Sequence, residues 1–195
     1  IAPAMLNTTG MNALVDWVLV ELRNKNNPSV IMATKSALLQ REGDVVGTNG
    51  STRLIFPVAA DNYYVALRHR NHLGAMIATS VLLNAYQRTI DLTSPALGTY
   101  GTDALATLTN GRKAFWSGNV LRDGVLKYVG TGNDRDPILT VVGAGTPTNT
   151  VNGYQQADVT LDGQVKYTGV SNDRDPIIVN LGGNTPNVVR TEQLP

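Results

Sequence analysis

Hydrophobic residues in the first part of the chain come in short runs separated by Asn, Asp, Gly and Pro. The runs Val15–Arg23, Val30–Leu39 and Tyr63–Arg70 have the length of strands, and the last alternates between two faces with a period of two. Two further runs, Leu54–Val58 and Leu73–Ala78, have similar lengths, although the apolar residues after Leu73 also fit a helix. Several short strands separated by turns predict a mainly β fold, an antiparallel β-sandwich.

From residue 118 onward the sequence repeats itself. The segment Val120–Pro147 aligns with Val159–Pro186 at an offset of 39 residues, and 15 of the 28 aligned positions are identical. Chance does not produce such identity over this length, so this part of the chain is a duplicated unit. We therefore predict a sandwich domain with an apolar N-terminal tail over residues 1–117 and a tandem repeat over 118–195, with copies at 119–147 and 158–186.

The second copy opens with the pattern of a calcium-binding loop. Asp158, Thr160 and Asp162 carry oxygen at alternate positions, and the Gly that follows permits a sharp turn, as at the start of an EF-hand loop. The pattern then departs from the EF-hand, because Lys and Gly stand where later ligands would be. A loop extended by about four residues would be closed by Asp173, or by Asn172 in its place. The predicted ligands are Asp158, Thr160, Asp162, Gln164 and Asp173.

The first copy carries a weaker form of the same loop. Asn119 and Leu121 stand where the second copy has an Asp and a Thr, whereas Asp123 and Asp134 are retained. Because the loss of leading oxygen ligands weakens the hold on a hard cation, we expect one competent and one degenerate calcium site. The candidate ligands of the first copy are Asn119, Asp123, Val125 and Asp134. The alternative for both loops is a turn held by hydrogen bonds of the Asp side chains alone.

Each copy continues into a segment that favours a short helix. The segments Asp136–Gly143 and Asp175–Gly182 place Asp at the N-cap, Pro at the first helical position and Gly after the end. A helix of about two turns is not stable by itself, so it must pack on its duplicate or on the sandwich. Arg135 and Arg174, each between two Asp residues, are expected to hold carboxylates or carbonyl groups of their own copy.

These motifs resemble a known arrangement. The repeat resembles the dockerin-type duplicated calcium loops near the C-termini of large secreted bacterial proteins. The upstream strings DWVLVELR, SALLQREGDVV and NYYVALRHRNHLG resemble a β-rich module that precedes such repeats in cell-surface proteins of Bacteroidetes-like bacteria. Together they cover about residues 14–195. The resemblance implies an extracellular or cell-surface location and a sandwich followed by a small dockerin-like module of calcium loop plus short helix. Because both loops are stretched, it does not imply docking to a cohesin.

Composition narrows the possible functions. The 16 basic and 15 acidic residues give a net charge of +1, which provides no basic field for nucleic acid or a membrane surface. The absence of cysteine excludes disulfides, thiolate metal sites and a Cys nucleophile. No apolar run approaches the roughly 20 residues of a membrane span. Since the chain starts with Ile1, we expect either a processed mature form or a piece of a longer protein.

Only the segment Arg68–His72 has a catalytic appearance. His69 shares a strand face with Val65 and Leu67, so a partly buried structural histidine is the simpler interpretation, and two histidines without a third ligand do not make a zinc site. No Ser lies in a nucleophile elbow, and no Gly-rich phosphate loop follows a strand. The aromatic residues could form a carbohydrate platform, but core packing is expected for them. We therefore expect no enzyme.

The sequence thus predicts a non-catalytic, extracellular structural or assembly protein stabilised by calcium. The apolar tail Ile1–Asn12 has no partner strand in sequence. It could add to a sheet edge of a neighbouring copy and build a fibre or filament, or it could cover its own sandwich. The expected partners are other copies or cell-surface proteins, not nucleic acid or a membrane. The alternatives are a binding module for a polysaccharide or cohesin-like partner, and an accessory domain of a hydrolase.

Overall fold

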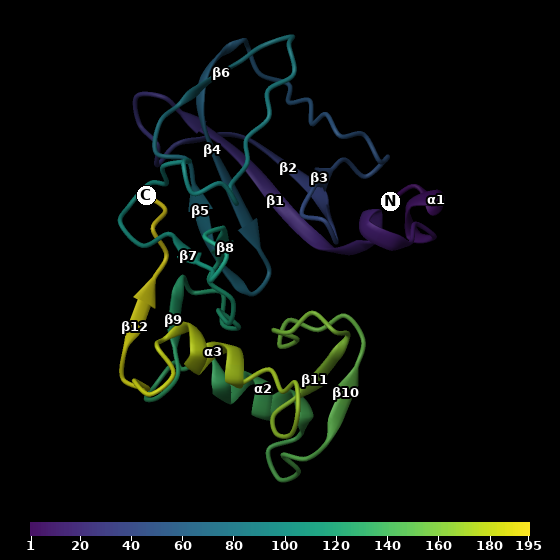
Figure 1. The fold of residues 1–195 in the computed structure, drawn as a ribbon, viewed down its shortest axis with the longest axis vertical. Helices are drawn as coiled ribbons and strands as arrows, with labels where there is room; N and C mark the ends of the chain where they lie inside the picture. The colour runs from purple at the N-terminus through teal and green to yellow at the C-terminus, as the bar shows by residue number, and fades with distance from the viewer.

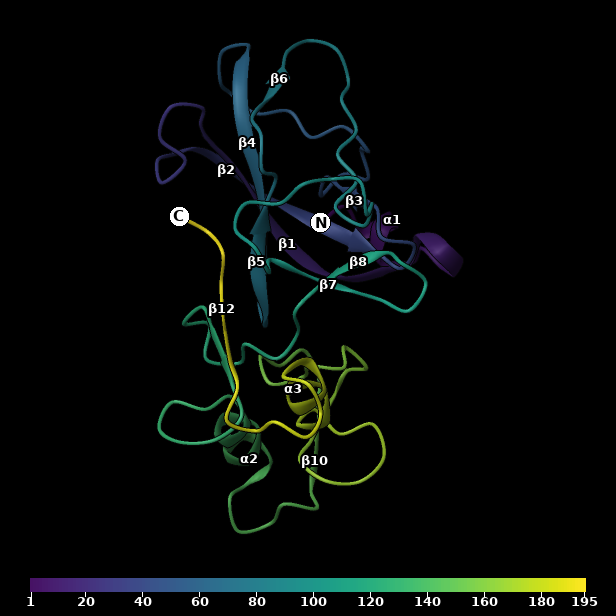
Figure 2. The same ribbon diagram turned by 60° about the vertical axis from the view of Figure 1, so that its left-hand side comes forward.

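The computed structural model describes all residues from Ile1 to Pro195. It has two lobes, one built around a β-sheet and one built from the repeat (Figures 1 and 2). Strands hold 31% of the residues and helices 11%, and every strand pair is antiparallel. The predicted mainly β, antiparallel class is confirmed. None of the helices has the length and apolar character needed to cross a membrane.

Six strands form the main sheet, in the spatial order β3-β2-β1-β4-β5, with β6 paired to another part of β4. Four of the five predicted runs form strands, and the stretch after Leu73 forms strands rather than a helix. The prediction of a strand at Leu54–Val58 is wrong. This segment contains Pro57, which lacks an N–H for a ladder, and its apolar side chains pack onto the sheet without pairing. The bounds are β1 Leu14–Asn24, β2 Ile31–Gln40, β3 Val45–Val46, β4 Asp61–His69, β5 His72–Met76 and β6 Val81–Leu83.

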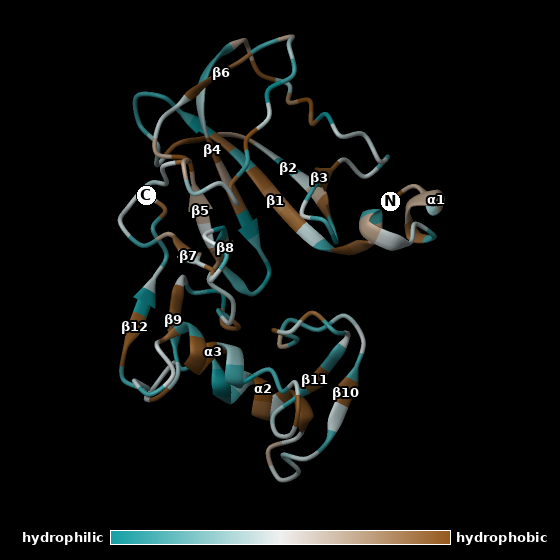
Figure 3. Cartoon of the chain, in the orientation of Figure 1, coloured by the Kyte–Doolittle hydropathy of each residue, from teal (hydrophilic) through white to brown (hydrophobic).

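One face of the main sheet carries the apolar core of this lobe. Alternate residues Val18, Val20 and Leu22 of β1 are buried there with Val65 of β4. Figure 3 shows β1 largely in the brown of hydrophobic residues. The layer over them is mostly irregular chain from residues 54–58 and 81–97. A second extended sheet does not cover this face, because residues that favour turns interrupt the covering chain, namely Pro57, Asn84, Asp91, Ser94 and Pro95. The only other strands before the repeat are β7 Leu105–Thr107 and β8 Lys113–Phe115, which pair with each other.

The opposite face of β1 is charged, although it is buried. Glu21 and Arg23 are 3% and 2% exposed. The Glu21 carboxylate accepts hydrogen bonds from Arg23 Nε at 2.9 Å and Nη2 at 2.7 Å, and from Arg68 Nε at 2.9 Å. Arg68 Nη1 in turn donates to Glu192 at 2.8 Å. Each buried charge therefore has a partner of opposite sign, and Glu192, close to the end of the chain, supplies the last one.

The repeat lobe consists of two strand–helix–strand units. The last strand of each unit pairs with the first strand of the other, so that β10 pairs with β11 and β12 pairs with β9. The helices bring Ile138 and Ile177 into a common core with Leu126 and Val165. Each unit is thus completed by the other. The bounds are β9 Val125–Lys127, α2 Arg135–Val142 and β10 Thr150–Asn152, then β11 Gln164–Lys166, α3 Asp175–Asn180 and β12 Val189–Thr191.

The two units have the same backbone. The central pair Val151↔Val165 corresponds, at the offset of 39 residues, to Arg190↔Leu126. Arg122 and its equivalent Leu161 both take the left-handed conformation, at φ 58° and 59°. Side chains with a Cβ rarely adopt this conformation, so its recurrence shows that the loop shape, as well as the sequence, is duplicated.

The predicted helix caps need correction. Both helices begin at or before the Asp that was expected to cap them, so Asp136 and Asp175 lie in the first turn. Their backbone N–H groups instead donate, each at 3.0 Å, to Asn133 and Asn172, whose side chains also hold the two carboxylates. An Asn three residues upstream thus satisfies the free N–H, which leaves the Asp to interact with the positive end of the helix.

The N-terminal tail is partly helical rather than extended. It forms α1 Pro3–Leu6 and a 3₁₀ turn at Gly10–Asn12. It lies along the chain around β3, where Ala2 N donates to Thr48 O at 2.9 Å and Arg41 N donates to Ala13 O at 2.9 Å. The tail therefore contacts its own lobe in this structure.

Candidate functional site

Each loop is closed by a buried Asp that accepts hydrogen bonds from the backbone. In the second copy, Asp173 Oδ1 accepts from the N–H groups of Val159 at 2.7 Å and Thr160 at 3.0 Å, and Oδ2 accepts from Lys166 at 2.8 Å. The side chain is fully buried, and burial raises the pKa of Asp173 above its usual value. Asp173 thus joins the start of the loop to β11.

Asp134 does the same in the first copy. Its carboxylate accepts from Leu121 N at 3.1 Å and from Lys127 N at 2.9 Å. Burial raises the pKa of Asp134 to about 6. Neither Asp134 nor Asp173 forms an ion pair with any Lys, Arg or His. Two negative charges are therefore buried in the loops without a positive side chain to balance them.

Asp158 lies at the start of the second loop and is 2% exposed. Its Oδ1 accepts from Asp162 N at 3.2 Å and its Oδ2 from Gly163 N at 3.0 Å, so the loop wraps around this carboxylate. Thr160 Oγ1 lies 3.4 Å from Asp158 Oδ1 and 3.1 Å from Asp173 Oδ1. The structure thus brings three of the five predicted ligands of this copy together.

The other two predicted ligands lie further out. Asp162 Oδ1 accepts from Gln164 N at 2.9 Å, and its Oδ2 is 3.5 Å from Lys166 Nζ on the surface. Gln164 belongs to β11, where it pairs with Asn152. No group of three or more His, Cys, Asp or Glu side chains is arranged to hold a metal ion. The second loop offers carboxylate and hydroxyl oxygen atoms, which suit a hard cation. Its acidic side chains are not gathered into a single coordination shell.

The first loop does not fit a cation as well. Leu121 is 42% exposed and offers no oxygen at the position of the Thr. Asp123 Oδ1 accepts from Val125 N at 2.9 Å, as its equivalent Asp162 does with Gln164. Asn119 is buried, and its Oδ1 has no hydrogen-bond partner. Of the predicted ligands here, only Asn119 and Asp134 bring buried side-chain oxygen to the loop.

The second loop is also the junction between the two lobes. Arg70, at the turn after β4, donates from Nε to Asp16 Oδ2 at 2.9 Å. Its Nη2 lies 3.6 Å from Asp158 Oδ2, and its guanidinium lies over the ring of Tyr154 at 4.6 Å. It also donates to the Gln155 carbonyl oxygen. One Arg thus joins a carboxylate of the sheet to the first carboxylate of the loop.

Asp16 is the sheet's side of this junction. Its side chain is fully buried and accepts from Tyr154 Oη at 2.7 Å and from Trp17 N at 2.7 Å. His69 Nε2 lies 3.1 Å from Oδ2, but not in the direction of a good hydrogen bond. Burial by itself would raise the pKa of Asp16, but His69 and Tyr154 outweigh it and lower this pKa well below its usual range. The pKa of Tyr154 is raised to about 12 by burial and by Asp16.

The turn after β4 inserts a second side chain into the repeat. Asn71 is fully buried, and its Nδ2 donates to the carbonyl oxygens of Gln156 at 3.0 Å and Asp158 at 2.7 Å. Its Oδ1 lies 2.9 Å from His72 Nδ1. Burial lowers the pKa of His72 to about 3. Both the backbone and the carboxylate of Asp158 are therefore held by the sheet lobe.

Comparisons with protein-family models, with curated proteins and with solved structures found no match to this chain. The geometry of the loops and of the junction is therefore the basis on which a function can be proposed.

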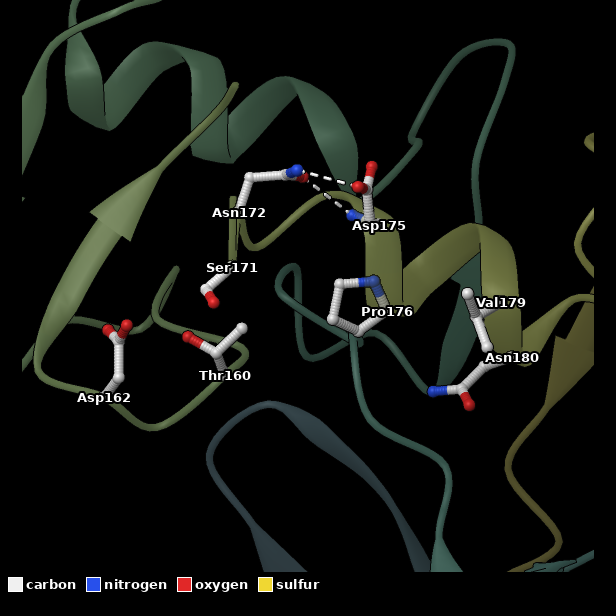
Figure 4. A pocket seen from close by; sticks show the side chains of 8 residues that line it. All are labelled: Thr160, Asp162, Ser171, Asn172, Asp175, Pro176, Val179 and Asn180. Carbon is white, nitrogen blue, oxygen red and sulfur yellow. Dashed lines mark hydrogen bonds between the residues drawn. The ribbon is translucent and has the colours of Figure 1, made fainter. Parts of the chain in front are cut away.

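A hollow of about 570 Å³ lies between the second loop and α3 (Figure 4). Thr160 and Asp162 line it from the loop, and Asp175, Pro176 and Asn180 line it from the helix. At its rim Asn172 Nδ2 donates to Asp175 at 2.7 Å. A mostly polar, open hollow of this kind lacks the enclosed apolar walls that bury an organic ligand.

Sequence reasoning missed the junction. It took His69, within Arg68–His72, as a partly buried structural histidine and gave Asp16 no role. The sequence contains two signals of this junction. Asp16 lies within an apolar run whose residues are expected to be buried, and Arg68 and Arg70 lie close together at a turn. What the pattern could not supply was their pairing, because Asp16 and Arg70 are 54 residues apart.

Proposed function

We propose that the chain is a non-catalytic structural module of an extracellular protein, in which a calcium ion at the second loop stabilises the joint between the repeat and the sheet. One observation carries this proposal. Asp158 is both the first predicted ligand of the loop and a point at which Arg70 and Asn71 hold the repeat. A cation bound there would act on the stability of the whole chain.

The charges of the loop support this reading. Asp158 and Asp173 are buried within reach of one hydroxyl, and the only positive group near them is Arg70, 3.6 Å from Asp158. Buried carboxylates are costly unless they are balanced by a positive charge. When bound, calcium would supply that charge through oxygen ligands, which it prefers. The residues of the chain would orient the two carboxylates and exclude water from behind them.

The dockerin-like identity of the repeat and its extracellular location belong to the same proposal. They are supported by the duplicated loop, the short helix after each loop and the sequence resemblance. Docking to a cohesin is not included. The second loop and α3 offer an open polar hollow, and nothing in it indicates a protein partner.

The test is thermal unfolding with calcium and with a chelator. A ligand at 100 times its dissociation constant adds about 2.7 kcal/mol, which raises the melting temperature by several degrees. Asp158→Asn removes the charge of the first predicted ligand and should remove most of the difference between the two conditions. Asp123→Ala, in the loop of the first copy, is the control and should leave the difference intact. Identical melting curves of the wild-type protein with calcium and with chelator would refute calcium binding.

Self-assembly through the N-terminal tail is a further part of the structural role. Leu6 and Met11 are 67% and 60% exposed although both are apolar. On the sheet, β3 pairs with β2 only at Leu38 and Leu39, so the first part of β2 is an unpaired edge. Deletion of Ile1–Leu6 should leave the sheet folded and remove higher-order species in light scattering. A wild-type protein that stays monomeric at high concentration would argue against a fibre.

The alternative function is a binding module for a polysaccharide. It is favoured by Tyr86, an aromatic residue that is 83% exposed in a loop. Binding on a glycan array that is lost in Tyr86→Ala would support this alternative over the structural role.

A further inference from the structure

The last eight residues of the chain, Val188–Pro195, are referred to below as the C-terminal segment. They leave the repeat through β12 and run past β5 to the sheet of the other lobe (Figure 2). Val189 pairs with Lys127, and Glu192 N donates to Gly124 O at 2.7 Å. The segment thus adds a strand to β9 by backbone pairing.

Side chains and backbone of the sheet lobe bind the end of this segment. Glu192 Oε1 accepts from Arg68 Nη1 at 2.8 Å, and Oε2 accepts from Gly74 N at 2.7 Å. The Pro195 carbonyl oxygen accepts from Arg23 Nη1 at 3.1 Å. A methyl group on Gly74 would lie 2.8 Å from Leu194 Cδ1, so only Gly leaves room for this approach. Glu192, Leu194 and Pro195 are therefore held by specific contacts.

The C-terminal segment is nevertheless outside the core of the repeat. At the centre of β10, Val151 packs against that core. The equivalent residue of β12 is Arg190, which stacks on Trp116 at 3.7 Å and donates to Asn180 O at 2.7 Å. None of the core residues of the repeat comes from Val188–Pro195. The segment can therefore leave its place without withdrawing a side chain from the core, whereas β10 would withdraw Val151.

The connection before β12 can change its path. Gly182 and Gly183 follow α3 at φ 101° and 76°, both in the left-handed region that suits Gly. Gly also has access to many other conformations, so a different direction of the chain at this point carries little strain. A hinge of this kind is the usual requirement for exchange of a terminal element between copies.

We propose that the C-terminal segment is exchanged between molecules, so that β12 of one chain pairs with β9 of a second copy and its Glu192 binds that copy's Arg68 and Gly74. The exchanged and closed forms share every contact of the segment and differ only at the hinge, so concentration decides between them. This inference rests on the structural role proposed above, because it provides a way for an assembly protein to join copies. It requires neither calcium nor the N-terminal tail.

The absence of cysteine in the chain allows a direct test. Two single-substitution proteins, Lys127→Cys and Val189→Cys, are mixed at high concentration, incubated and oxidised. Facing residues in an antiparallel pair lie at a distance that a disulfide can span, so a covalent heterodimer reports β12 of one chain on β9 of the other. The matched control is a mixture of Lys166→Cys and Thr150→Cys, the equivalent pair on β11 and β10.

Exchange predicts at least tenfold more heterodimer from the first mixture than from the control, with a yield that rises with concentration. Equal yields from the two mixtures would overturn the proposal. If either Lys variant folds poorly, Val125→Cys with Thr191→Cys, and Gln164→Cys with Asn152→Cys as control, repeat the test at the other end of each ladder. Each mixture is examined with calcium and with chelator. Heterodimer in both, with unchanged melting, would refute calcium binding while supporting exchange.

Discussion

The two copies of the repeat share a frame and differ in what lines their loops. In both copies a buried Asp holds backbone N–H groups, and an Arg lies over a Tyr ring, Arg135 over Tyr128 at 5.1 Å and Arg174 over Tyr167 at 5.2 Å. These arginines were predicted to hold carboxylates or carbonyl groups of their own copy, and each contacts a carboxylate there, Arg135 that of Asp136 at 3.8 Å and Arg174 that of Asp175 at 3.4 Å, both of which are long. Stacking on the Tyr ring is the closer description of their role.

The loops themselves differ at the positions that would face a cation. The second copy has Asp158 and Thr160 where the first has Asn119 and Leu121. Only the second copy forms an ion pair with Arg70, through Asp158. The difference shows that the backbone of this loop does not depend on the side chains of Asp158 and Thr160. It depends on Asp134 and Asp173, which accept hydrogen bonds from the backbone in the same way in both copies.

The largest expected effect is on the shared frame. Asp173→Ala would leave three buried backbone N–H groups without an acceptor, and Asp134→Ala would leave two. At about 1–3 kcal/mol for each unsatisfied group, unfolding measured in denaturant with chelator should show losses on the order of 5 and 3 kcal/mol. If either variant loses less than about 1 kcal/mol of unfolding free energy, the buried Asp does not stabilise both copies in the same way.

The next effect separates the copies through the junction. Arg70→Met removes the positive partner of Asp16 and Asp158, both of them buried, and should destabilise the protein by about 3 kcal/mol. Because Asp158 then lacks a counter-charge, calcium should restore more stability in this variant than it adds to the wild type. Arg112→Met, which removes an exposed ion pair with Asp91, is the control and should change stability by less than about 1 kcal/mol. If calcium adds the same stability to Arg70→Met as to the wild type, the junction does not influence calcium binding at the loop.

Acid should affect the junction and the first loop in opposite directions. The folded-state pKa of His72, about 3, lies below its ordinary value of 6.5, so the unfolded chain binds the proton first and stability is lost as the pH falls from 6.5 towards 3. The pKa of Asp134 is raised from 3.8 to about 6, so the folded chain binds that proton first and stability is gained as the pH falls through 6 towards 3.8. By pH 4 the loss of stability from His72 and the gain from Asp134 are each about 3 kcal/mol, so the two effects nearly cancel.

His72→Phe should therefore make the protein more stable at pH 4 than at pH 7 when unfolding is measured with chelator present. The Phe removes the titrating group while it keeps an aromatic ring in the buried position. A His72→Phe variant that is no more stable at pH 4 than at pH 7, like the wild type, would show that His72 is not the group that opposes Asp134.

The smallest expected effect is that of substitutions which give the first loop the residues of the second. Asn119→Asp with Leu121→Thr gives the first loop the leading oxygen atoms of the second, on a backbone that already has the right shape. The double variant should gain about 1–2 kcal/mol more from calcium than the wild type, measured as the shift in melting temperature. No added gain would mean that the contact with Arg70, which the first loop lacks, is part of what makes a loop competent.

The sequence by itself determined the local features. The runs that became β1, β2, β4 and β5 were visible as apolar stretches of strand length between turn residues, and the run of β4 also by its period of two. The duplication was visible as identity, and the two helices as an Asp-Pro start followed by Gly. The N-caps were misplaced because Asn133 and Asn172, three residues upstream, accept from the N–H groups of Asp136 and Asp175, which lie inside the first turn. Sequence pattern alone does not decide between two good capping residues three positions apart.

Only the tertiary structure decided how distant segments meet. The pairing of β12 with β9 joins residues more than sixty positions apart, and their few residues carry no pattern that names a partner. The same holds for Asp16 with Arg70, and for Glu192 with Arg68 and Gly74. Backbone pairing uses groups that every residue has, and a buried charge accepts any opposite charge within reach. Such contacts are selected by the packing of the whole chain, so the joint between the lobes became visible only in three dimensions.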